Sequence, residues 1–218
     1  MPQLFPKPSL EAKPFGSFNS PPSGRYELGG SPVPSVTEIL RDVGLGMDAR
    51  TVPEDLLANK SRIGTIVHEE IRRTLTEGDG TRLYEERVMG YLWSWREWYK
   101  RVEPFDIVAC ERSVIPSPLV AGTMDLLVRR KKDGRWILYD WKSRDPKWYD
   151  GFQLAGYLGL AALDPTIPYH WIDLPNTDRI IVSLREWDTA RERQFDDPED
   201  FEIFNAACRL WHARTRKR

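Results

Sequence analysis

The sequence predicts one α/β domain, in which helices flank a mixed central sheet that contains an antiparallel meander. Apolar residues follow helical spacing up to about residue 101, and strand-like runs fill the stretch from about 107 to 143. Beyond it, the patterns indicate a helix, a strand and a last helix. The 218 residues, of which 40% are hydrophobic, suffice for one compact core.

The first segment, residues 1–34, is predicted to be an extended or disordered arm, because it holds many of the 17 prolines together with Gly and Ser. One ordered domain is predicted over residues 35–218. Its first helix begins at Ser35, which forms an S-x-x-E capping box with Glu38. Gly44 can end this short helix.

Two longer helices are expected next. One runs from about residue 53 to residue 75 and could break near Asn59. The other spans roughly 82–101 and carries an apolar stripe at helical spacing. Trp93 lies on the side of this helix opposite to the stripe.

Three strands follow, and their links have turn chemistry, so consecutive strands are expected to be antiparallel neighbours. The strands are predicted over residues 107–115, 119–129 and 135–143. A helix that ends before Pro165 and a further strand come next, over residues 151–163 and 179–184. Asp197 caps the last helix and Pro198 starts it, and this helix runs to about Arg214.

The composition limits the class of protein. The sequence has no apolar run near the roughly 18 residues that a membrane span requires, and its start lacks the apolar core of a signal peptide, so a cytoplasmic location is expected. Cys110 and Cys208 are too few for a four-thiolate zinc or iron–sulfur site. The net charge of −1 is a weak objection to DNA binding, because DNA responds to local patches of charge.

Two acidic positions in the strands carry the first indication of chemistry. Asp140 and Lys142 are two residues apart in one strand and therefore point to the same side. Asp125 lies in the preceding apolar strand, and pairing of the two strands can bring it to Asp140. Facing carboxylates repel unless a cation lies between them, and oxygen ligands suit Mg²⁺ or Mn²⁺. The alternatives are a structural ion pair for Asp140 and Lys142, and backbone amides or Arg112 as partners for Asp125.

Further polar residues could join this group. His68 shares a helix face with Gly64, which would let the backbone approach the sheet closely, and it is either a metal ligand or a satisfied core residue. Glu111 on the first strand is either another carboxylate of the site or a surface charge. Gln153 and Tyr157 are one helical turn apart, and both could face the same cleft.

In this order the elements resemble the RecB-like branch of the PD-(D/E)xK nuclease superfamily, which has a restriction-endonuclease-like core. The matching elements are Gly64-x-x-x-His68, Glu111, Gly122-x-x-Asp125, Asp140-x-Lys142 and Gln153-x-x-x-Tyr157. The segments 34–37 and 140–143 are similar to mitochondrial genome maintenance exonucleases and their phage-encoded relatives, and the resemblance covers roughly residues 33–163. The proline of the usual first motif is absent, and so is the cysteine cluster with which CRISPR-associated relatives hold an iron–sulfur cluster.

The resemblance implies a metal-dependent DNA exonuclease that acts on single-stranded or free DNA ends with one or two Mg²⁺ or Mn²⁺ ions and no iron–sulfur cluster. Its implied catalytic residues are Asp125, Asp140, Lys142 and Glu111, and its implied metal ligands are His68, Asp125, Asp140 and the Trp141 carbonyl. Gln153 and Tyr157 would position Lys142 and the DNA backbone.

Other candidate DNA contacts come from the residue pattern. Ser35 and Thr37 could bind phosphate at their helix N-terminus, although the capping box uses the same hydroxyl. Lys60 and Arg62 precede His68 and are candidate phosphate contacts. Trp93 could stack on an unpaired base or pack under the N-terminal arm.

Two other functions stay open at this point, namely a structure-specific endonuclease on the same core and a DNA-binding module without activity. DNA is the expected partner, and a single-strand-binding or annealing protein is a further candidate. No membrane association and no nucleotide cofactor are expected. The cytoplasm of a phage-infected bacterial cell is one candidate location.

Overall fold

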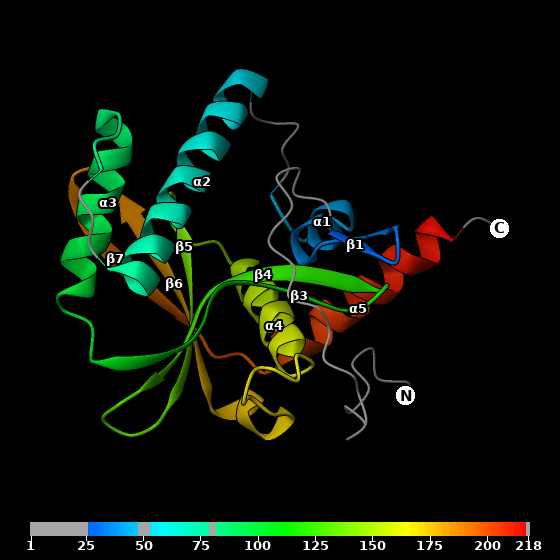
Figure 1. Ribbon diagram of the computed structural model, residues 1–218. Coiled ribbons are helices and arrows are strands. Elements are labelled where there is room, and N and C mark those ends of the chain that lie inside the picture. Colours follow the sequence, from blue (N-terminus) through cyan, green and yellow to red (C-terminus); the bar gives the residue numbers. More distant parts are fainter. Residues whose placement is uncertain (1–25, 48–52, 79–81, 217–218) are drawn as a thin grey trace.

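The computed structural model describes residues 26–47, 53–78 and 82–216, and it confirms a mixed central sheet flanked by helices (Figure 1). The five strands run in the spatial order β3-β4-β5-β6-β7. Only β5 and β6 are parallel, and the other neighbours are antiparallel, so β3 to β5 form the predicted meander. The bounds are β3 Phe105–Ser117, β4 Val120–Arg130, β5 Trp136–Lys142, β6 Thr177–Arg185 and β7 Asp188–Phe195.

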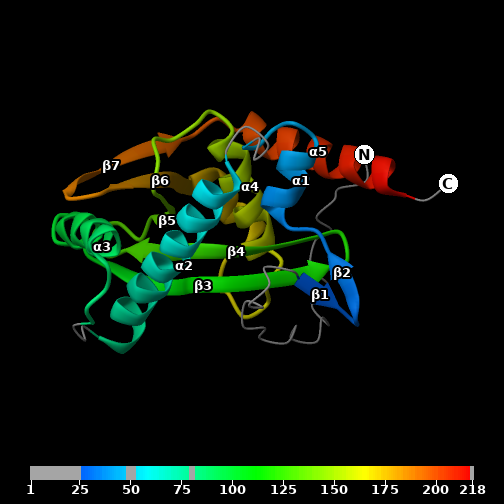
Figure 2. The same cartoon turned by 90° about the horizontal axis from the view of Figure 1, so that it is seen from above.

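Helices cover both faces of the sheet (Figure 2). α2 (Glu54–Glu77) and α3 (Glu86–Tyr99) pack on one face with a cluster that includes Leu126 and Val128. The second cluster joins Leu127 to the other helices, which are α1 (Val36–Asp42), α4 (Asp150–Ala161) and α5 (Glu199–Thr215). Successive residues of β4 thus enter opposite layers, as the alternation of a strand requires. A short 3₁₀ helix, η2 (Trp171–Asn176), precedes β6.

α1 has the ends that its sequence predicts. The Ser35 hydroxyl accepts a hydrogen bond from the Glu38 amide at 3.0 Å, and the Glu38 carboxylate accepts one from the Ser35 amide at 3.4 Å. At the other end Gly44 has φ +85°, and the Leu45 amide donates to the Leu40 carbonyl at 2.7 Å. This is a Schellman motif, which ends α1 and turns the following residues back against the helix.

Ordered structure begins before Ser35, contrary to the prediction of an arm over residues 1–34. β1 (Tyr26–Leu28) and β2 (Ser31–Val33) form a hairpin, while residues 1–25 lie outside the described residues. Gly29 and Gly30 both have positive φ, 59° and 80°, which is the pattern of a type I′ turn. A Gly-Gly pair between two short strands is a known hairpin signal, and the density of prolines concealed it.

One other expectation was wrong, and one strand was missed. α2 continues through Asn59 without a break, because Ile63, Val67 and Ile71 bury one continuous stripe against the sheet. Strand β7 was not expected, since its sequence, DTARERQF, is mostly charged, and seven of its eight residues are at least partly exposed at the sheet edge. No described helix is both long and apolar enough to cross a membrane.

Candidate active site

The site begins where β4 and β5 separate. Their backbone pairing ends at Leu126 and Tyr139, one residue before Asp125 would meet its partner. There the Asp125 carboxylate accepts a hydrogen bond from the Trp141 backbone amide at 2.7 Å, in a buried position. A side chain thus replaces the missing ladder bond, which fixes Asp125 at the opening between the two strands.

Glu111 on β3 lies across from Asp125. The registers Cys110–Leu126 and Arg112–Met124 leave these two acidic residues opposite each other. Glu111 has φ 44°, in the left-handed region that costs a non-glycine residue about 1–2 kcal/mol. Strain of this kind clusters at functional sites, where the surrounding structure holds it in place.

His68 approaches both carboxylates from the middle of α2. Its Nδ1 lies 3.0 Å from a Glu111 oxygen and 3.5 Å from an Asp125 oxygen. The three residues offer ligand atoms that all lie within 4.8 Å of one another. The close backbone approach expected at Gly64 is absent, because a Cβ there would have no heavy atom within 4 Å.

Asp140 and Lys142 at the end of β5 form the second half of the site. The two side chains share one side of the strand as predicted, and Lys142 Nζ lies 2.6 Å from Asp140 Oδ2. Gln153 on α4 donates to Asp140 Oδ1 at 3.3 Å and to the Tyr157 hydroxyl at 2.9 Å. Asp140 is 1% exposed, and its Oδ2 contacts the ammonium without hydrogen-bond geometry, so this oxygen has no hydrogen-bond partner.

Burial and mutual repulsion shape the charges of these groups. Burial raises the pKa of Asp125 to about 6, with His68 opposing and Glu111 adding to the rise. Burial also raises the pKa of Asp140 to about 6 against the opposing effect of Lys142. Burial disfavours the charged form of His68, but Asp125 and Glu111 outweigh it and raise the pKa of His68 to about 9. The pKa of Lys142 is raised by Asp140 and Asp125, again against burial.

This donor set fits a divalent cation. Carboxylate oxygens together with one imidazole suit Mg²⁺ or Mn²⁺, and a cation between the carboxylates would offset the burial and the repulsion that raise the pKa values of Asp125 and Asp140. The group within 4.8 Å contains Glu111, which had been expected as a supporting residue, and it does not contain Asp140. Asp140 and the Trp141 carbonyl therefore stay predicted ligands, and Asp140 Oδ2 is ion-paired with Lys142 Nζ at 2.6 Å.

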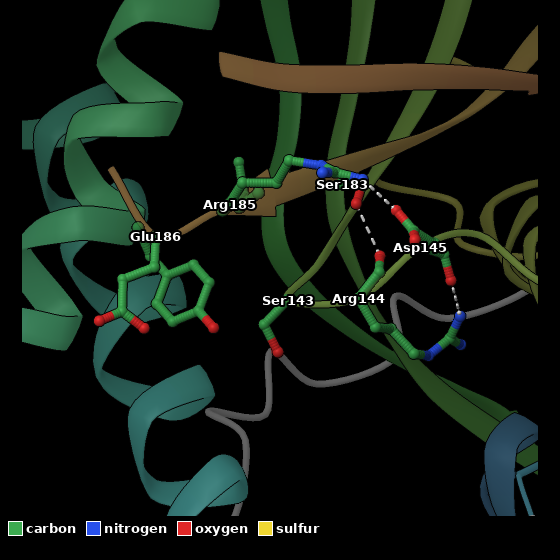
Figure 3. A pocket seen from close by; sticks show the side chains of 8 residues that line it. Ser143, Arg144, Asp145, Ser183, Arg185 and Glu186 are labelled. Atoms are coloured by element: carbon green, nitrogen blue, oxygen red, sulfur yellow. Dashed lines mark hydrogen bonds and ion pairs between the residues drawn. The ribbon is translucent and has the colours of Figure 1, made fainter. Parts of the chain in front are cut away.

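Two hollows border the Lys142 end of β5. A cavity of about 450 Å³ is lined by residues that include Thr37, Lys142 and Gln153. A second hollow of about 260 Å³ lies where β5 and β6 end (Figure 3). Arg144 lines both of them. In the second hollow, the Ser183 hydroxyl donates to the Arg144 carbonyl at 2.7 Å, and Arg185 pairs with Asp145.

The other predicted DNA contacts lie apart from the metal ligands. The Ser35 hydroxyl is engaged in the cap of α1. Lys60 and Arg62 are exposed on α2, and Arg62 pairs with Glu85 at 2.6 Å. Trp93 is 36% exposed and lies beside exposed Trp187, with ring centroids 6.5 Å apart.

One residue near the site was not expected from the sequence. Tyr26, on the hairpin, lies 2.8 Å from the Thr123 hydroxyl, which lies 2.7 Å from that of Ser113. Burial raises the pKa of Tyr26, and the carboxylates of Glu111 and Asp125 raise it further, so its phenol lies near the acidic group. The Gly-Gly turn was the signal that could have placed Tyr26 in the folded domain.

Comparison with known proteins agrees with this arrangement. The PD-(D/E)XK nuclease superfamily matches residues 38–212. The chain is 13% identical to the protein in the crystal structure of SSO0001, with a TM-score of 0.35, and the match covers 71% of this chain and 76% of that one. No curated protein matches the sequence. Since the family match spans the whole sheet and all the acidic residues described above, this chain belongs to the PD-(D/E)XK nuclease superfamily.

Proposed function

We propose that this protein is a metal-dependent DNA exonuclease of the RecB-like branch, which hydrolyses phosphodiester bonds at single-stranded or free DNA ends with Mg²⁺ or Mn²⁺. One observation carries the proposal. His68, Glu111 and Asp125, from α2, β3 and β4, converge to within 4.8 Å, and the end of β5 adds the buried Asp140 paired with Lys142. A structural role alone does not require three acidic groups of which two have raised pKa values.

In this proposal His68, Glu111, Asp125 and Asp140 hold the metal. A divalent cation, when bound, polarises the scissile phosphate and acidifies water. Lys142 is a charged ammonium, because the neighbouring carboxylates raise its pKa, and it acts as a donor that orients the attacking water and stabilises the negative charge that develops on the phosphate.

Gln153 and Tyr157 position the carboxylate rather than react. The Gln153 amide reaches the Tyr157 hydroxyl and Asp140 Oδ1 together, while Asp140 Oδ2 contacts Lys142 Nζ at 2.6 Å. A residue that holds a ligand in place supports the metal affinity through that ligand. We therefore assign both residues a positioning role, beside the DNA contacts that the resemblance implies.

The substrate preference is supported by one feature beside Lys142 and by one on α3. The cavity of about 450 Å³ adjoins Lys142, and the exposed Trp93 with Trp187 offers aromatic surface on which unpaired bases stack at about 1–3 kcal/mol each. Single strands and frayed ends expose the bases that such surfaces bind.

The test is a time course on linear oligonucleotides labelled at either end and on a closed circle, in Mg²⁺, in Mn²⁺ and in EDTA. We expect metal-dependent loss of the linear strands and an intact circle. Asp140→Asn and Lys142→Gln should lower the rate at least about 100-fold, and Asp106→Asn and Lys132→Gln, which are exposed on the meander, are the matched controls. Activity that survives the first two substitutions refutes the site, and a cleaved circle indicates an endonuclease instead.

A further inference from the structure

The cavity beside Lys142 has a wall built by the end of α1. The Schellman motif brings Leu45 back against Leu40, and both side chains line the cavity. Gly46 packs so closely that a Cβ there would lie 2.8 Å from the Arg41 backbone nitrogen. The wall is therefore preformed by main-chain hydrogen bonds and close packing. It continues into Met47, which is 42% exposed.

The lining of the cavity is also positively charged. Arg41, Lys142 and Arg144 line it, and no aspartate or glutamate does so among the described residues. Lys142 and Arg144 pair with Asp140 and Asp150, whose side chains are 2% and 0% exposed and which do not line the cavity. Arg41 pairs at 3.0 Å with Asp42, whose second oxygen accepts a bond from Trp211.

A lining with both apolar and cationic side chains and a volume of about 450 Å³ match a nucleotide, which has an apolar base face and an anionic phosphate. Small-molecule sites commonly have volumes of about 300–1,000 Å³. Leu45, Met47, Leu57 and Tyr149 offer the surface for a base, and Arg41 with Arg144 offers planar guanidinium groups for a phosphate.

We propose that this cavity is a nucleotide subsite, which holds the terminal nucleotide of a DNA strand with its base on the apolar wall and its phosphate beside Arg41 and Arg144. The proposal rests on the exonuclease function for its substrate. Because Lys142 belongs to both the cavity and the catalytic group, a nucleotide held here lies next to the bond that would be cut. The expected product is then a nucleoside monophosphate.

The test is calorimetric titration of the full chain, without added metal, with thymidine 5′-monophosphate, thymidine 3′-monophosphate, thymidine and inorganic phosphate. We expect one of the two monophosphates to bind at least about tenfold more tightly than thymidine or phosphate alone, since only the nucleotide can contact both the apolar and the cationic side chains. The isomer that binds reports which end of the strand is held. Equal affinity for a monophosphate and for inorganic phosphate, or binding of neither monophosphate, overturns the subsite.

Two variants locate the binding. Arg41→Gln and Met47→Glu change exposed lining side chains and should each weaken monophosphate binding about tenfold. Arg101→Gln and Leu83→Glu make the same exchanges at exposed positions outside the cavity and should change it less than about twofold. Equal effects of the two pairs refute the location, and thermal unfolding verifies that all four variants fold.

The outcomes separate this subsite from the proposed function. Monophosphate binding by a chain that does not degrade oligonucleotides retains the subsite and rejects the exonuclease. Degradation to short oligonucleotides by a chain that does not bind monophosphates rejects the subsite alone.

Discussion

Replacing Gly122 by alanine should press a new methyl group against α4, the helix that carries Gln153. A Cβ at this position would lie 2.9 Å from Tyr157 Cε1 and 2.9 Å from Leu160 Cδ1. Both side chains are buried, at 7% and 0% exposure, so neither can swing into solvent. The Tyr157 hydroxyl is bonded to Gln153, which also holds Asp140, and displacement of the ring is transmitted to the carboxylate.

The size of the effect follows from two opposing contributions. Overpacking of this kind costs about 1–3 kcal/mol. Alanine also restricts the backbone of the unfolded chain, which stabilises the folded state by about 0.4–1 kcal/mol. We expect a net loss of about 1–2 kcal/mol in the free energy of unfolding, which lowers the melting temperature by about 2–8 °C. A shift of a few tenths of an ångström at Asp140 should also lower kcat by about threefold to tenfold.

Gly64→Ala is the matched control, because it adds the same methyl group where no heavy atom lies within 4 Å. In the middle of α2 it should stabilise the protein by about 1 kcal/mol. Urea denaturation and thermal melting measure whether each variant is more or less stable than wild type. If Gly122→Ala unfolds at or above the wild-type temperature, or if Gly64→Ala unfolds below it, the packing argument fails.

Three further predictions concern the charges and the aromatic surface. In EDTA, Asp125→Asn should gain stability relative to wild type as the pH rises from about 4 to about 6. Burial raises the pKa of Asp125 from 3.8 to about 6, so in this pH range the folded wild type binds a proton that the unfolded chain has lost, and wild type loses stability as the pH rises. Equal differences in melting temperature between variant and wild type at pH 4.5 and pH 7 would contradict this. Mg²⁺ or Mn²⁺ should raise the melting temperature of wild type and not that of His68→Ala. An equal rise in both proteins would show that His68 is not a metal ligand. Trp93→Ala should weaken binding of a single strand by about 1–3 kcal/mol and leave duplex binding unchanged, as measured by fluorescence anisotropy, with Leu83→Ala as the exposed control.

Local patterns of the sequence were sufficient for most of the elements. The Ser35–Glu38 capping box, the stop at Gly44 and the apolar stripes of the long helices depend on residues within a few positions of each other. The hairpin before Ser35 was also encoded locally, by Gly29 and Gly30, but a proline-rich composition suggested an arm. Strand β7 had no local signal, because its charged residues are tolerated only where a sheet edge meets solvent.

The sequence by itself determined that Asp140 and Lys142 share a face, because a strand alternates with a period of two. Tertiary structure alone decided which carboxylates meet. Glu111 joins His68 and Asp125 because a strained β3 backbone and the early end of β4–β5 pairing place them together. The contact between His68 and Glu111 joins residues 43 positions apart, which no local pattern relates. The cavity beside Lys142 has the same origin, since its lining comes from α1, α2, the end of β5 and the start of α4, which no local pattern relates.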